Sequence, residues 1–201
     1  MLVLGTIAPC FTSARAALIP GITASADRGP SVGFNLANLV NGAGLPGDVP
    51  TLEGQHAYQS FTNAWQSGPP VNITFDLHAE YFVSTMCVWP WSSNASVSAR
   101  DVQVSYSADG TSFYALPDGP GEFPYVGNWG SQWQTRYDFS PVVATHMRIK
   151  ILSNWGYRSP SGFAYTGLSE VQFGGAPTPE PATLCLLALG AAAVLRRRRG
   201  H

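Results

Sequence analysis

The sequence predicts an all-β protein, an antiparallel β-sandwich, and three observations support this. In several short segments, apolar and polar residues alternate with a period of two. In the body of the chain, by contrast, no amphipathic helical pattern runs longer than two turns. Turns rich in Gly and Pro separate the alternating segments. Many short strands joined by such turns are typical of a sandwich.

Four segments alternate in this way, namely residues 71–77, 101–106, 147–151 and 169–173. Alternation places every second side chain on the core face of a strand. The residues expected to face inward are Val71, Ile73, Phe75, Leu77, Val102, Val104, Tyr106, Val171 and Phe173. We expect Arg148 and Lys150 to face outward in the third segment, and Glu170 to face outward in the fourth.

Three further segments complete the secondary-structure prediction. Residues 82–89 are apolar almost throughout, which predicts a central strand that is buried on both faces. Residues 35–40 predict a short helix or a turn. The sequence Ala-Asp-Gly-Thr at 108–111 predicts a tight turn between two strands of a hairpin. Cys87 lies inside the apolar run and is expected to be a buried core thiol.

Composition restricts the class of partner. Residues 18–175 have the size of one compact domain. Six basic and eleven acidic residues between Leu18 and Ala176 give this body a net charge of about −5. An acidic surface is a poor electrostatic partner for nucleic acid or anionic lipid. We therefore expect no nucleic-acid partner.

The C-terminal segment, residues 176–201, has three parts. Pro179-Glu180-Pro181 lies in a Pro-rich spacer, residues 182–195 form an apolar run, and Arg196 to Arg199 follow it. As a short hydrophobic helix, the run of about 14 residues spans roughly 21 Å. A comfortable transmembrane span requires about 20 residues. The arginines can snorkel and hold this end on the cytoplasmic side, so the segment indicates a temporary membrane anchor.

An anchor of this kind belongs to an exported chain, and residues 1–17 are interpreted as a partial signal peptide. They contain an apolar stretch and a small-x-small cleavage site at Ala14-Arg15-Ala16. They lack the basic residues that normally precede the apolar stretch. We therefore expect the complete signal to begin upstream of Met1.

The spacer, apolar run and arginines together resemble the PEP-CTERM sorting signal of Gram-negative bacteria. The resemblance implies that an exosortase-type membrane protease recognises Pro179, Glu180 and Pro181 and removes the tail. It also implies transient anchoring in the inner membrane, followed by release to the outer surface or the extracellular matrix. The alternative is an ordinary tail-anchor helix that follows prolines.

The order of the segments in residues 18–175 resembles the discoidin domain, also called the F5/8 type C domain. The segments that carry the resemblance are residues 22–25, 38–42, 64–68 with 71–77, 104–113, 144–149 and 167–171. The resemblance implies a galactose-binding-like jelly-roll sandwich whose loops at one end bind ligands. The connection at residues 43–63 is longer than in typical members.

The resemblance also implies a structural calcium site formed by Asn41, Thr62 and Glu170. Calcium takes oxygen ligands from carboxylates, carbonyls and hydroxyls. Asn41 replaces the customary Asp, which removes one charge from the site. The alternative is that Glu170 is simply the solvent-facing residue of an alternating strand.

Two loop segments, residues 125–133 and 154–158, combine aromatic side chains with polar groups. Sugars bind to aromatic faces and to hydrogen-bond donors such as Arg. The candidate ligand-binding residues are Trp129, Trp133, Trp155, Tyr157 and Arg158. The alternative is that some of these tryptophans plug the ends of the sandwich.

We find no nucleophile elbow, zinc-protease helix, redox Cys pair or phosphate loop, and therefore do not expect an enzyme. The sequence predicts an exported binding module for carbohydrate, with exopolysaccharide as the candidate partner. The alternatives are a structural or adhesive matrix protein that contacts other proteins, and a hydrolase whose site is built from residues 43–63.

Overall fold

In the computed structural model, the residues described are 16–31, 33–57, 65–91, 94–127, 130, 132–156 and 165–179. Residues 1–15 of the predicted signal peptide (1–17) and the tail helix predicted at 182–195 lie outside them. Within the described part of the chain, no helix is long and apolar enough to cross a membrane.

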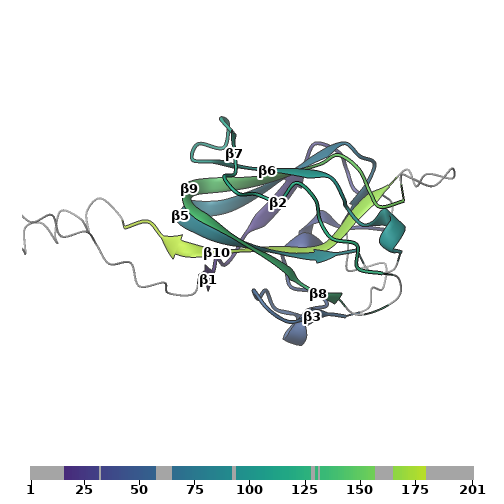
Figure 1. The fold of residues 1–201 in the computed structure, drawn as a ribbon. Coiled ribbons are helices and arrows are strands. Elements are labelled where there is room, and N and C mark those ends of the chain that lie inside the picture. Colours follow the sequence, from purple (N-terminus) through teal and green to yellow (C-terminus); the bar gives the residue numbers. More distant parts are fainter. Residues whose placement is uncertain are drawn as a thin grey trace, which may run out of the picture.

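Among the described residues, eight strands form one sheet in which the main order is β1-β10-β5-β9-β6-β7, with β2 added to β5 and β4 to β10. All their pairings are antiparallel, which confirms the predicted all-β class. Their bounds are β1 Ala17–Leu18, β2 Thr23–Ala26, β4 Trp65–Ser67, β5 Val71–Pro90, β6 Val102–Ser107, β7 Tyr114–Ala115, β9 Thr135–Ile151 and β10 Thr166–Pro177 (Figure 1).

The remaining elements are small. β3 (Gln55–His56) and β8 (Gln132–Trp133) pair in a separate two-stranded sheet below the sandwich in Figure 1. Three 3₁₀ helices, η1 (Leu36–Leu39), η2 (Pro46–Asp48) and η3 (Ala95–Val97), are described as well. η1 confirms the predicted short helix or turn, and the Asn35 side chain caps it by accepting a hydrogen bond from the Ala37 N–H.

Two long strands, β5 and β9, turn a corner and serve both layers of the sandwich. The first part of β5 pairs with β2 through residues 73–76, whereas its second part pairs with β10 through residues 81–90. The pairing of β5 with β9 is interrupted between Asp76 and Tyr81, where His78 adopts a positive φ of 58°. An irregularity of this kind bends a strand. The two segments predicted as separate strands, 71–77 and 82–89, are therefore parts of one strand.

The core lies between the two layers. All four inward residues predicted for the first segment, Val71 to Leu77, are at most 1% exposed. Phe75 of β5 packs edge-to-face against Phe173 of β10, with 5.2 Å between the ring centroids. The predicted burial of Cys87 is also confirmed, since it is a free and fully buried thiol.

The predicted outward position of Glu170 is wrong. Residues 166–175 of β10 are buried continuously, and Glu170 is 0% exposed. The reason is that chain segments from elsewhere cover the second face of β10. Gly42, which follows η1, donates its N–H to the Glu170 carboxylate, and the Val40 carbonyl accepts a hydrogen bond from the Gln172 amide on the same face.

The predicted hairpin between β6 and β7 is confirmed. Ser105 pairs with Ala115, and Tyr106 pairs with Tyr114. The Asp109 carboxylate holds the turn by accepting hydrogen bonds from the backbone N–H groups of Thr111 and Ser112. These hydrogen bonds hold the pKa of Asp109 well below its usual range.

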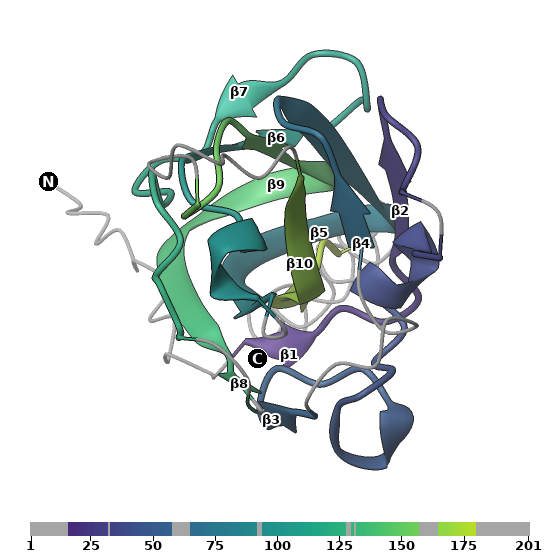
Figure 2. The ribbon, with the colours of Figure 1, turned by 90° about the vertical axis from the view of Figure 1, so that its right-hand side faces the viewer.

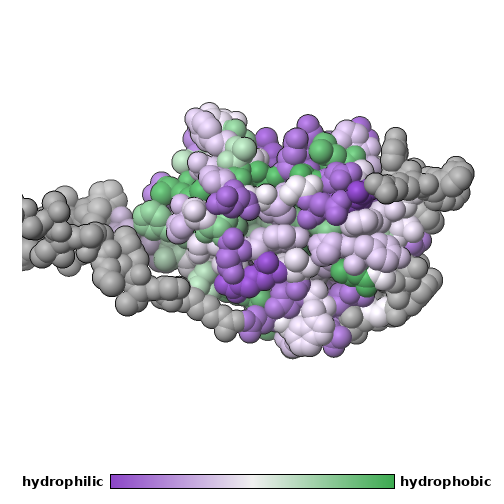
Figure 3. Space-filling model, viewed as in Figure 1, coloured by the Kyte–Doolittle hydropathy of each residue, from purple (hydrophilic) through white to green (hydrophobic). Residues whose placement is uncertain are grey.

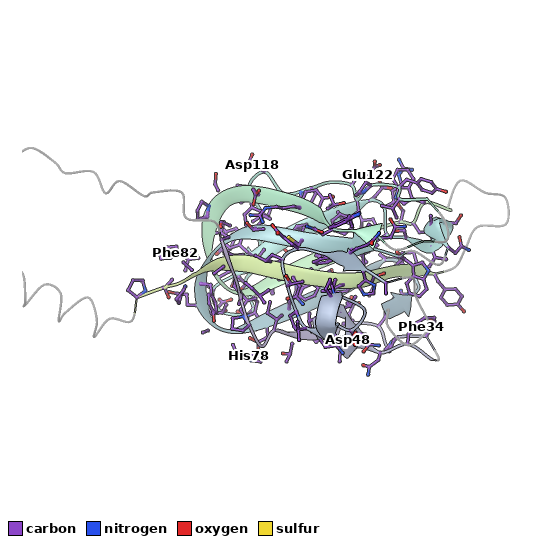
Figure 4. All side chains as sticks on the ribbon, turned by 90° about the horizontal axis from the view of Figure 1, so that it is seen from below. Phe34, Asp48, His78, Phe82, Asp118 and Glu122 are labelled. Carbon is purple, nitrogen blue, oxygen red and sulfur yellow. The ribbon has the colours of Figure 1, made fainter. Side chains whose placement is uncertain are left out.

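The two ends of the sandwich differ. The chain leaves the sheet through β1 and β10 at one end, while the loops that follow β5 and β9 lie at the opposite end (Figure 1; Figure 2 shows that end facing the reader). In Figure 3, hydrophobic residues gather toward the end at which β10 leaves the sheet, and hydrophilic residues dominate the middle of the face. Phe82, which is 41% exposed, marks this end in Figure 4.

Candidate functional site

Three loop segments meet at the end of the sandwich opposite the one at which β1 and β10 leave the sheet (Figure 1). We call this the loop end, and it comprises residues 94–101, 122–127 and 152–156. Isolated β-bridges join Ala99 to Asn154 and Asp101 to Glu122. The Trp155 N–H also donates to the Ser98 carbonyl at 3.2 Å. Because backbone hydrogen bonds join the three segments, their side chains have fixed relative positions.

Trp155 is held at the centre of the loop end by three contacts. Its indole Nε1 donates to the Phe123 carbonyl at 3.1 Å. The Tyr125 ring meets it edge-on, with 5.5 Å between centroids and an interplanar angle of 70°. The Arg100 guanidinium lies 4.7 Å from the centre of the Trp155 ring, which is a cation–π distance.

Charged groups surround this aromatic pair. Arg100 Nε donates to Glu122 Oε2 at 2.9 Å and lies 3.8 Å from Asp101 Oδ1. The Asp101 carboxylate also accepts a hydrogen bond from the Ser153 hydroxyl. Tyr125 is 53% exposed, so an aromatic side chain and several hydrogen-bonding groups reach solvent together. Figure 4 shows Glu122 and Phe34 near this end of the molecule.

The structure places the predicted ligand-binding residues unequally. Trp155 lies at the loop end, as described. Trp133 lies on β8, opposite Gln55 of β3, and is 64% exposed. Trp129, Tyr157 and Arg158 lie outside the described residues. Sequence reasoning missed Arg100 and Glu122, because no spacing pattern connects them with a tryptophan more than 30 positions further along the chain.

Of the predicted metal-site residues, Glu170 is fully buried. Its Oε1 accepts hydrogen bonds from the Gly42 N–H at 3.0 Å and from Gln172 Nε2 at 2.5 Å. The same Gln172 nitrogen donates to the Val40 carbonyl at 2.9 Å. Within the described residues, Glu170 Oε2 is buried and has no hydrogen-bond partner.

Burial raises the pKa of Glu170 to about 8, although the hydrogen bonds from Gln172 and Gly42 oppose this shift. Asn41 is exposed, and its Oδ1 accepts from the Ala43 N–H at 2.9 Å. Thr62 lies outside the described residues. No group of three or more His, Cys, Asp and Glu side chains that could hold a metal occurs in the part of the chain described here.

The sorting motif begins at the edge of the sandwich. Pro177, the last residue of β10, pairs with Tyr81 of β5. Thr178 then donates both its N–H and its hydroxyl to the Glu80 carbonyl, each at 3.1 Å. Pro179 is exposed, while Glu180 and Pro181 lie outside the described residues.

Two families of known proteins match this chain. The F5/8 type C domain matches residues 22–163, and the PEP-CTERM protein-sorting motif matches residues 177–199. The chain therefore belongs to the F5/8 type C domain family and carries a PEP-CTERM sorting motif at its C-terminal end. No curated protein matches the chain.

Solved structures share the fold at low sequence identity. One is the CBM32-5 module of CpGH89 from Clostridium perfringens in complex with GalNAc-β-1,3-galactose. It is 16% identical to this chain in sequence, with a TM-score of 0.56. The match covers 79% of this chain and 100% of that one. Another is the family 32 carbohydrate-binding module of NanJ from C. perfringens in complex with galactose, with 14% sequence identity and a TM-score of 0.54. That match covers 78% of this chain and 96% of the module.

A third match lies inside an enzyme. The family 89 glycoside hydrolase of C. perfringens, in complex with GlcNAc-α-1,4-galactose, is 18% identical with a TM-score of 0.52. The match covers 80% of this chain but 15% of that one. The fold of this chain is thus the fold of carbohydrate-binding modules, including some that form part of glycoside hydrolases.

Proposed function

We propose that this protein is an exported, non-catalytic binding module that attaches to carbohydrate, with exopolysaccharide as the candidate partner. Its family membership and its likeness to carbohydrate-binding modules support this proposal. The PEP-CTERM motif supports export with membrane association before processing. In this proposal an exosortase-type protease removes the tail, and the domain then resides on the outer surface or in the extracellular matrix.

The observation that carries the proposal is the fixed aromatic group at the loop end. Sugars offer apolar C–H faces and hydroxyl groups, and proteins bind them with aromatic side chains and charged hydrogen-bonding groups. The hydrogen bond to Phe123 and the Arg100 contact fix Trp155 before any ligand arrives. A fixed side chain loses less entropy when it binds than a mobile one. Trp129, Trp133, Tyr157 and Arg158 are proposed to extend the same surface.

A second candidate function is structural or adhesive, with protein rather than sugar as the partner. Exposed aromatic residues are also typical of protein interfaces. Trp133, Tyr125 and Tyr165 are 64%, 53% and 47% exposed, respectively. Binding to proteins rather than to glycans is therefore the main alternative result of the glycan-microarray experiment described below.

We further propose a structural calcium ion held by Glu170, with Asn41 and Thr62 as additional ligands. The buried, unpartnered Oε2 of Glu170 is the kind of oxygen that a hard cation binds. A bound ion would supply the positive charge that this buried carboxylate lacks. The Gln172 amide already joins Oε1 to the Val40 carbonyl, so the ion is proposed to reach the carboxylate through Oε2.

The proposed function can be tested on a glycan microarray with the full-length chain in detergent micelles. We expect retention on one or more glycans, and loss of that retention in Trp155→Ala. Thr111→Ala, an exposed substitution in the β6–β7 turn at the other end of the sheet, is the control. Capture of matrix proteins without any glycan would instead favour the structural function.

A further inference from the structure

A second polar site lies away from the loop end, on the outer face of the sheet. It is an open groove of about 380 Å³ that crosses β2, β5 and β9 and is closed on one side by the β6–β7 turn. Its lining residues are Thr23, Ala24, Ser25, Thr74, Asp76, Gly110, His146 and Arg148. His78, which contacts this groove, lies across the molecule from Asp118 and Glu122 in Figure 4.

The groove exists because β2 forms one wall with small side chains, and because the β6–β7 turn approaches the groove without filling it. β2 contributes only Thr, Ala and Ser side chains. Gly110, with a φ of +73°, lies over the His146 ring, and a Cβ built there would come within 2.9 Å of His146 Cε1. Glycine therefore leaves open the space above the imidazole.

Arg148 is fixed at the floor of this groove. Its guanidinium lies over the Phe113 ring, 3.4 Å from the centroid, and its Nε donates to Thr74 Oγ1 at 3.0 Å. Neither terminal guanidinium nitrogen makes a hydrogen bond or an ion pair with any residue that the structure describes. The planar guanidinium is therefore already oriented, and its strongest donors remain available.

The carboxylate in the groove is occupied by other partners. Asp76 Oδ1 accepts from the His78 N–H at 2.7 Å and lies 3.8 Å from His146 Nε2. Asp76 Oδ2 lies 3.4 Å from His78 Nδ1. Two imidazoles therefore face Asp76, and no described residue compensates the charge of Arg148 in an ion pair.

These groups define the chemistry of the ligand. A fixed guanidinium pairs best with a carboxylate, because the two groups form a bidentate pair of hydrogen bonds. Thr23, Ser25 and His146 offer hydrogen-bonding groups for hydroxyls beside it. No Phe, Tyr or Trp side chain is among the described residues that line the groove, so a neutral sugar would find no such ring there on which to stack. A dianion such as phosphate would meet only one guanidinium and a nearby carboxylate.

We propose that this groove binds an acidic sugar, a hydroxylated ring that bears one carboxylate. Its volume lies at the lower end of the range of small-molecule sites, which suits one or two sugar rings. The site differs in chemistry and in position from the aromatic loop end. A protein with both sites can join two polysaccharide strands, or two parts of one acidic strand.

The test is isothermal titration calorimetry of the full-length chain in detergent micelles with trigalacturonate and trimannuronate, and with maltotriose as the neutral probe. We expect at least one acidic trisaccharide to bind and maltotriose to bind at least tenfold more weakly. Arg148→Gln should weaken acidic binding at least tenfold. Ser25→Asp, an exposed substitution that preserves the core, should do the same by repulsion.

The matched control is Lys150→Gln, which removes one positive charge from the same strand outside the groove. It should leave the affinity within twofold of the wild type, because Lys150 does not line the groove. The proposal is overturned if neither acidic trisaccharide binds, if Arg148→Gln and Ser25→Asp both bind normally, or if Lys150→Gln weakens binding as much as Arg148→Gln. Because these readouts do not involve the loop end, their failure leaves the proposed function standing.

Discussion

The Glu170 carboxylate and the Gln172 amide, two residues apart on β10, are joined inside the sandwich by a hydrogen bond of 2.5 Å between Oε1 and Nε2. Residues two apart on a strand lie on the same face, so this pair lies on one face of β10. The amide offsets only part of the cost of burying the carboxylate, since Oε2 has no partner among the described residues.

The first prediction is that this pair makes stability depend on pH. The folded-state pKa of Glu170 is raised to about 8 from 4.5. The protonated form is therefore favoured in the folded state, and its contribution is complete below pH 4.5. The free energy of unfolding should fall as pH rises from about 5 to 8, by an amount on the order of 4 kcal/mol without a bound cation.

Glu170→Gln removes this titration. Urea unfolding in EDTA, measured at several pH values, should show no loss of stability for the variant as pH rises through the range in which the wild type loses stability. Burial lowers the pKa of His56, which makes both proteins less stable as pH falls below about 6.5. Parallel profiles for the two proteins would contradict the assignment.

The second prediction concerns calcium. A ligand that binds only the folded state raises stability by about 2.7 kcal/mol at a hundred times its dissociation constant. Excess calcium at pH 7.5 should therefore raise the melting temperature of the wild type by several degrees over EDTA, and Glu170→Gln should show no rise. An unchanged midpoint for the wild type would remove the calcium proposal.

The strands of the sandwich could be predicted from the sequence because apolar and polar residues alternate with a period of two when one face of a strand is buried. This alternation placed Val71, Ile73, Phe75 and Leu77 correctly in the core. It failed at Glu170 because alternation says nothing about what covers the second face of a strand. The covering residues follow η1, about 130 positions earlier in the chain.

The sequence also predicted Trp155 as a site residue, yet it contained no signal for Arg100 or for the groove. Asp76, His146 and Arg148 each read as an ordinary outward position of a strand. His78 and His146 look unrelated in sequence, and both face Asp76 only because β5 pairs with β9. Chemistry that depends on pairing between distant strands cannot be read from local spacing.

The third prediction tests the register between β10 and β5. A Cβ on Gly175 would lie 2.4 Å from the Phe82 carbonyl oxygen, which is a backbone atom and cannot move aside easily. Gly175→Ala should therefore lower the free energy of unfolding by about 2 to 3 kcal/mol. Gly121→Ala is the control, since nothing lies within 4 Å of its Cβ. Equal urea midpoints for the two variants would show that the close approach is absent.

The fourth prediction concerns the support of Trp155. Arg100→Met removes the cation–π contact and the ion pairs with Glu122 and Asp101, whereas Glu122→Gln weakens only the ion pair with Glu122. We expect the first change to cost about 1 to 2 kcal/mol and the second less than about 1 kcal/mol, because Glu122 is partly exposed. Urea unfolding measures both costs. Identical losses would mean that the cation–π contact contributes nothing.

The attachment of this exported domain to carbohydrate through its loop end can be tested by one affinity measurement. Calorimetry with the strongest ligand from the glycan microarray should give at least a tenfold weaker dissociation constant for Trp155→Ala than for the wild type, with Thr111→Ala unchanged. A Trp155→Ala protein that binds this glycan as tightly as the wild type would contradict the account.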